Sequence, residues 1–135
     1  MHIHLKRGEK LYLNGAVLRL DRRATLELMN DAQFLMESHV MQAERATTPL
    51  RQLYFVTQTM LMDPANADMT AALYKHQSAQ LRRLCHTAGI LAALDKADTF
   101  VLGFRYFDAL KMLRATFALE DEILNGAIAL RVEAA

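Results

Sequence analysis

TTPLRQLYFVTQTMLM, residues 47–62, is the stretch that decides the fold expected for this chain. Thr48 can cap the free N–H groups of a helix, and Pro49 suits the first helical position, where its missing N–H costs nothing. Apolar residues then recur at three- and four-residue spacing and leave little polar surface. We predict a buried core helix that ends before Asp63-Pro64, with a face buried against a partner as the alternative.

A β-hairpin is predicted upstream of this helix. Residues 9–13 and 16–20 alternate between apolar and polar side chains and flank Asn14-Gly15, a strong signal for a two-residue hairpin turn. That turn fixes the register, so that Leu11 lies opposite Leu18 on a face turned to the core. Lys10 lies opposite Arg19 on the other face, beside Tyr12.

Further elements complete the predicted fold. Residues 2–6, 24–29 and 33–38 are expected to be strands, the last two around an Asn30-Asp31 turn, although residues 26–35 also fit a helix. Strands followed by helices indicate an α+β domain, a small N-terminal antiparallel β-meander packed on a C-terminal bundle of about four helices. Besides residues 47–62, the predicted helices span 68–86, 90–102, 104–115 and 119–125, with ends or bends at Gly89, Gly103 and Gly126.

Length and composition limit the classes of protein to which the chain can belong. With 135 residues it is expected to be one domain, mainly β over 1–40 and mainly α over 41–126, with a tail at 127–135. No apolar run reaches the roughly 18 residues that span a bilayer, and the N-terminus resembles no signal peptide. The single cysteine, Cys85, suits a reducing compartment. We therefore expect a cytoplasmic protein that does not enter a membrane.

The net charge of +1 is unevenly distributed. Residues 1–23 carry six Lys and Arg against two acidic residues, a net charge of +4, which leaves −3 on the remaining 112 residues. A basic end on an otherwise acidic body favours an anionic partner for that end.

The basic residues of the predicted hairpin are a candidate nucleic-acid surface. Like charges directly opposite each other, as at Lys10 and Arg19, destabilise a hairpin unless the face meets an anion. Cations could bind phosphates there, and Tyr12 could stack on an unpaired base. The alternative is a solvated sheet face whose long cationic side chains merely cover Tyr12. The candidate RNA-binding residues are Lys6, Arg7, Lys10, Tyr12, Arg19, Arg22 and Arg23.

No catalytic or metal-binding pattern emerges from the sequence. His2 and His4, with His39, make too few ligands with supporting spacing for a metal site. Cys85 and His86 point about 100° apart on a helix, which does not form a nucleophile–base pair. The acidic run at residues 120–122 is interpreted as a solvated helix start. We expect no enzyme activity, no metal and no cofactor.

Three stretches together resemble the FlbT family of flagellin synthesis regulators of alphaproteobacteria. They occur in the family's order and at its length, and the likeness covers nearly the whole chain. The stretches are LKRGEKLYLNGAVLRLDRR at 5–23, TTPLRQLYF at 47–55 and FDALKMLRATFALEDEIL at 107–124.

The resemblance implies a post-transcriptional regulator. Members of the family act on the 5′ untranslated region of flagellin messenger RNA, repress its translation and promote its decay, although some act positively. The implied partners are the flagellin mRNA leader and FlaF or another flagellar regulator, and a homo-oligomer is also expected because exposed apolar patches tend to find partners. The alternative is a protein-interaction module that uses the apolar faces of residues 90–124 without binding RNA directly.

Overall fold

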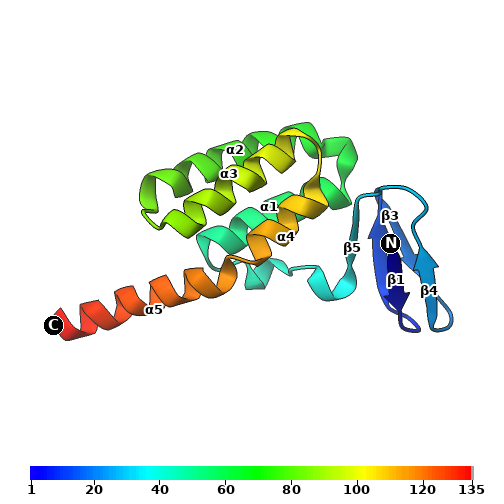
Figure 1. Ribbon diagram of the computed structural model, residues 1–135, viewed down its shortest axis with the longest axis horizontal. Helices are drawn as coiled ribbons and strands as arrows, with labels where there is room; N and C mark the ends of the chain where they lie inside the picture. Colours follow the sequence, from blue (N-terminus) through cyan, green and yellow to red (C-terminus); the bar gives the residue numbers. More distant parts are fainter. Residues whose placement is uncertain (135) are drawn as a thin grey trace.

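Five short β-strands precede five α-helices in the computed structural model of the chain (Figure 1). The structure describes the backbone of residues 1–134 and the side chains of residues 1–126. The predicted α+β class is confirmed. The strands are β1 (His2–Leu5), β2 (Lys10–Leu13), β3 (Ala16–Arg19), β4 (Ala24–Glu27) and β5 (Phe34–Met36). The helices are α1 (Pro49–Met62), α2 (Ala67–Leu84), α3 (Ala88–Leu102), α4 (Tyr106–Arg114) and α5 (Phe117–Ala134), with short 3₁₀ turns at Glu37–His39, Ala43–Arg45 and Pro64–Asn66.

Helix α1 is the core helix, as predicted. Thr48 caps it, its hydroxyl accepting the Arg51 N–H at 3.3 Å, and Pro49 occupies the first turn. Leu53 and Met60 are fully buried. Helices α2 and α4 pack on α1, and α3 packs on α4, so that the helical core forms around α1 (Figure 1).

The predicted hairpin is confirmed in position and register. β2 and β3 pair antiparallel, with Lys10 opposite Arg19 and Leu11 opposite Leu18. Asn14 and Gly15 have φ angles of 48° and 83°, the left-handed values that a tight two-residue turn between twisted strands requires. The Asn-Gly pair is suited to this turn because both residues tolerate positive φ.

We expect Gly15→Ala to lower the free energy of unfolding by about 1–2 kcal/mol, because an L side chain is strained at positive φ. A Cβ on Gly15 would also lie 3.3 Å from Cδ of Pro64. Urea denaturation followed by circular dichroism measures the change. Asn14→Gly is the matched control, since glycine accepts this backbone and stability should stay nearly constant. Equal unfolding midpoints for the two variants would contradict the expectation.

The strands form two stacked sheets instead of one continuous meander. β1 pairs with β4, while β2 lies between β3 and β5 in a second sheet. The two strands predicted around Asn30-Asp31, β4 and β5, therefore do not pair with each other. Stacking encloses Ile3, Leu5, Leu11 and Phe34 in one apolar cluster. In a single flat sheet these apolar side chains would face water, which explains why the strands divide into two sheets.

The sheets join the helices through β5 and the start of α4. Leu35 is buried in the helical core, and the Phe34 ring stacks on Phe107 with centroids 4.6 Å apart. The Gln33 side chain accepts the Phe107 N–H at 2.8 Å. These contacts fix the hairpin on the helical group.

The buried face of α2 is small and partly polar. Tyr74, Ser78 and Leu81 are its buried residues. Tyr74 and Ser78 can be buried because their hydroxyls donate to Asp98 of α3 at 2.7 and 2.9 Å. Several other apolar side chains along this helix are exposed, among them Met69, Ala72, Leu73 and Leu84.

Two predictions about the C-terminal helix were also wrong. α5 runs through Gly126 to Ala134 instead of ending at Asn125-Gly126. Glu120, interpreted as part of a solvated helix start, is 5% exposed and belongs to the core. The tail expected at residues 127–135 lies on the α5 backbone as far as Ala134, while its side chains and residue 135 lie outside the described residues.

Candidate nucleic-acid interface

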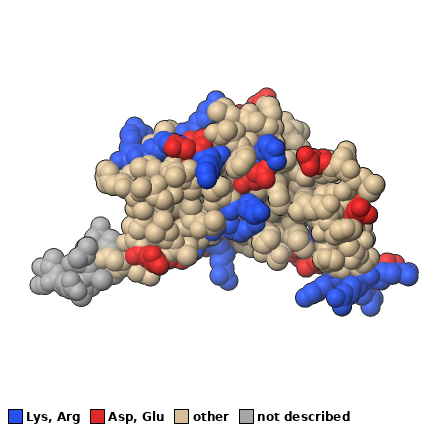
Figure 2. Space-filling model, viewed as in Figure 1, with Lys and Arg blue, Asp and Glu red and all other residues tan. Residues whose placement is uncertain are grey.

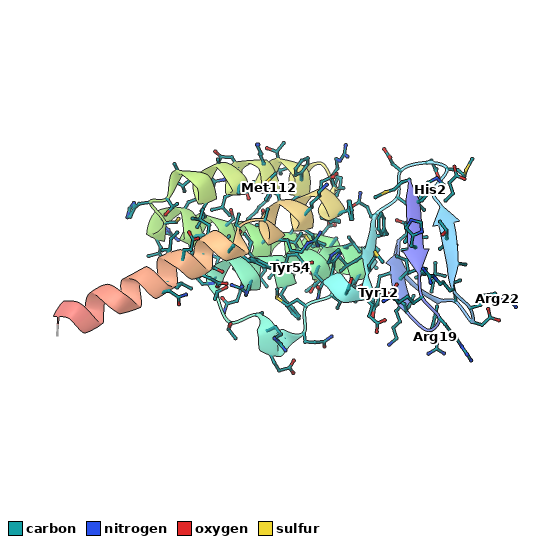
Figure 3. The ribbon with its side chains drawn as sticks, turned by 60° about the horizontal axis from the view of Figure 1, so that its bottom comes forward. His2, Tyr12, Arg19, Arg22, Tyr54 and Met112 are labelled. Atoms are coloured by element: carbon teal, nitrogen blue, oxygen red, sulfur yellow. The ribbon has the colours of Figure 1, made fainter. Side chains whose placement is uncertain are left out.

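The structure places the predicted cations at the end of the sheets that is distant from the helices. Lys10 and Arg19 are opposite each other on the hairpin ladder, and both are exposed. Figure 3 shows Arg19 and Arg22 at this outer end, pointing away from the helical group. In Figure 2 the same end carries a dense group of Lys and Arg side chains, at the lower right.

Two loops bring the remaining cations to this end. The Gly8 N–H donates to the Leu20 carbonyl at 3.0 Å, so the loop that carries Arg7 lies beside the one that leads to Arg22. Arg7 and Arg19 line one shallow hollow, and Lys6 and Arg23 line another. The cations therefore form one group, which we call the basic end: Lys6, Arg7, Lys10, Arg19, Arg22 and Arg23.

Few carboxylates neutralise the basic end. Among the described side chains, its one ion pair joins Arg22 to Asp21 at 3.5 Å, with both side chains more than 80% exposed. An exposed pair of this kind contributes at most about 1 kcal/mol, so a phosphate can displace it. Glu9 and Glu37 are also near. Their carboxylates accept the backbone N–H groups of Lys6 and Lys10 at 3.4 and 2.9 Å, and neither forms an ion pair among the described side chains. Glu37 lies 27 residues from Lys10, and no local sequence signal indicated this contact.

Tyr12 occupies a different environment from the cations. Its side chain is half-buried and packs against the helical core, next to Leu35 in the β2–β5 pair. In Figure 3 Tyr12 lies on the side of the sheet that faces the helices. The stacking role predicted for Tyr12 therefore has less support than the phosphate roles of the cations, because much of the ring already has a partner.

Helix α2 also carries the basic residues Lys75, Arg82 and Arg83, of which Arg82 forms ion pairs among the described side chains. Arg82 donates to Asp95 at 2.6 Å and to Asp98 at 2.7 Å. These hydrogen bonds, first that to Asp98, raise the pKa of Arg82. Arg82 thus has a structural role between α2 and α3.

The histidines do not form a cluster in the described part of the chain. His4 Nδ1 lies 2.9 Å from the Thr25 hydroxyl across the β1–β4 pair. His39 lies near α1, where its carbonyl accepts the Tyr54 hydroxyl at 2.6 Å. Burial, together with the charge of Arg114, lowers the pKa of His39. Within residues 1–126 no three His, Cys, Asp or Glu side chains are arranged to hold a metal ion.

No helix in the described part of the chain is both long and apolar enough to cross a bilayer.

Several known proteins that are similar to this chain are named FlbT. The model of the family described as "Flagellar protein FlbT" matches residues 1–124. The chain is 48% identical over 125 residues to the "Probable flagellum biosynthesis repressor protein FlbT" of Rhizobium johnstonii, covering 93% of this chain and 84% of that protein. It is 48% identical over 126 residues to "Probable flagellum biosynthesis repressor protein FlbT 2" of Bradyrhizobium diazoefficiens, covering 93% of each.

A third relative is the "Probable flagellum biosynthesis repressor protein FlbT" of Mesorhizobium japonicum. The chain is 47% identical to it over 126 residues, which cover 93% of this chain and 86% of the relative. No solved structure matches the chain. The family model spans both the basic end and the core helix. The chain therefore belongs to the FlbT family.

Proposed function

We propose that this protein is a post-transcriptional regulator of flagellin synthesis that binds the 5′ untranslated region of flagellin mRNA through its basic end. The names of its relatives support a repressor role in flagellum biosynthesis. The observation that carries the proposal is the gathering of six exposed cations on one outer end of the sheets, largely free of ion pairs among the described residues. This is the electrostatic footprint expected of a nucleic-acid partner.

The proposed mechanism is occlusion of the leader. Lys6, Arg7, Lys10 and Arg19 bind phosphates, and Arg22 and Arg23 extend the contact along the strand. A short, weakly paired RNA is recognised through phosphates, stacking and loop shape, and Tyr12 is the candidate for stacking. With the leader covered, translation falls, and cellular nucleases degrade the unprotected message in the cytoplasm. The protein itself needs no catalytic group and no cofactor for this role.

Binding of the leader RNA is expected to weaken steeply with salt. If all six cations contact phosphates of a single strand, the logarithm of the binding constant should fall with the logarithm of salt concentration at a slope of about −4. Titration of labelled flagellin leader at several salt concentrations measures the slope, with an unrelated leader as control. A slope near zero, or equal affinity for both RNAs, would contradict direct and selective recognition.

A second candidate function rests on the exposed apolar side chains of the helical group. Leu102 and Phe104 are 69% and 68% exposed, at the turn between α3 and α4. Such residues favour a protein partner, in this case FlaF, flagellin or another flagellar regulator. An apolar interface of this kind would bind almost equally well at low and high salt, so the titration described above separates the two functions.

A further inference from the structure

Helix α5 extends away from the body of the protein. Its first turns are fixed on the helical core by Phe117, Leu119 and the buried Glu120. From Asp121 to Gly126 every described side chain is exposed. Figure 1 shows the rest of α5 running outward, with the C-terminus far from the other helices.

The outer part of α5 has the composition of a buried helix. Ile123 and Leu124 are each 39% exposed. The sequence from 123 to 132, ILNGAIALRV, has one charged residue, Arg131. Helices that are apolar on most sides are normally enclosed by other protein. Ile123 and Leu124 keep part of their surface in contact with water among the described residues, which indicates that a partner covers them.

An apolar hollow lies in the seam between α2 and α3. These helices pack on α1 and α4 more than on each other. Polar contacts connect them, because Tyr74, Ser78 and Arg82 of α2 all donate to Asp98 of α3. Beside these contacts remains a hollow of about 200 Å³, with Ala79, Val101 and the exposed Leu102 in its wall.

The charges of the seam complement those of α5. Lys75, Arg82 and Asp98 are the charged residues that line the hollow, a net charge of +1. Arg82 and Asp98 pair with each other at 2.7 Å. Lys75 is exposed and has no ion pair among the described side chains. On α5, the exposed carboxylate of Glu122 directly precedes the apolar pair Ile123–Leu124.

We propose that the α2–α3 seam binds helix α5 of a second copy of this chain. Ile123 packs on the apolar wall at Leu102, and Glu122, about 100° round the helix from Ile123, faces Lys75 at the edge of the seam. In a two-fold symmetric dimer the same contact forms twice, once on each copy. The exposed part of the Ile123 side chain is thereby covered.

The first test measures the mass of the full-length protein by sedimentation over a wide concentration range. The wild type is expected to form a dimer. Leu102→Glu in the seam and Ile123→Glu on α5 are each expected to weaken dimerisation at least tenfold, because each buries an unpaired charge in the contact. Leu84→Glu is the matched control. It introduces the same change at a highly exposed α2 position outside the hollow, and should leave the dimer unchanged.

The second test exchanges the charges of the proposed pair. Lys75→Glu and Glu122→Lys each place like charges in both contacts of the dimer, so each variant alone should dimerise less tightly than the wild type. Mixing the two variants should restore the dimer, because both contacts of the mixed dimer again join opposite charges.

Two results would overturn the proposal. One is a wild-type protein that stays monomeric at every concentration, which would assign the seam to a different partner. The other is a dimer that neither the glutamate substitutions nor the charge exchange weakens, which would place the contact on another face. All of the substituted side chains are exposed, and circular dichroism verifies that each variant is folded.

Discussion

Reversing both charges at Lys10→Glu and Arg19→Glu is expected to weaken binding of flagellin leader RNA by at least about a hundredfold at physiological salt. The two residues face each other across the hairpin, so the double substitution removes two phosphate contacts and adds two repulsive carboxylates at one place. The slope of affinity against salt should also become shallower by between about 1 and 2, since roughly 0.7 is lost for each phosphate contact. Regulation of flagellin synthesis in cells should fail with the binding.

The matched control distinguishes the effect of the basic end on RNA binding from the effect of the protein's net charge. Arg83→Glu with Lys96→Glu changes the net charge by the same amount, at two exposed positions on α2 and α3 far along the chain from the hairpin. This variant should bind the leader nearly as well as the wild type. Normal regulation by a folded Lys10→Glu/Arg19→Glu protein, or an equal loss in both double variants, would exclude the basic end as the RNA site.

Glu120→Ala is expected to lower the free energy of unfolding by about 3 kcal/mol, because it breaks a buried ion pair from one side. The Glu120 carboxylate accepts the Thr48 hydroxyl at 2.5 Å, the Leu50 N–H at 2.8 Å and an Arg51 guanidinium N–H at 3.1 Å. Removing it leaves the Leu50 N–H without its partner at the start of the core helix. It also leaves Arg51 with one carboxylate fewer, above the ring of Phe117.

Asp121→Ala is the control for this prediction. Asp121 also pairs with Arg51, at 2.9 Å, but its side chain is half exposed, so the loss should stay below about 1 kcal/mol. Urea unfolding followed at the helical circular dichroism signal measures both variants. Equal losses for the two would show that Glu120 acts only as a surface charge, against its burial in the structure.

The parts of the fold that the sequence predicted correctly are those with local signals. The start of α1 is marked by two adjacent residues, the cap Thr48 and the first helical residue Pro49. The Asn14-Gly15 turn sets the hairpin register without the need for contacts to distant segments. For the same reason the position of Lys10 opposite Arg19 followed from the register alone. These patterns act over a few residues, which is the range in which backbone propensities determine structure.

The parts that could not be predicted depend on contacts between distant segments. The carboxylate of Glu120 is buried because it meets α1, 70 residues earlier, although its neighbours in sequence resemble a solvated helix start. Tyr74 and Ser78 turn inward because Asp98 accepts their hydroxyls, which a pattern of apolar residues does not register. Tyr12 lies at the junction with the helices for a similar reason. Its neighbour Leu35 is on β5, which follows β4 in the sequence but pairs with β2.

The contact between Glu120 and the start of α1 has a consequence for synthesis on the ribosome. The chain emerges from its N-terminal end, so α1 leaves the exit tunnel long before the residue that completes its first turn, 70 positions later. The β-strands and their basic end can form early, whereas the helical group closes only after Glu120 has left the tunnel. A nascent or prematurely terminated chain that lacks Glu120 would therefore display cations without a finished core.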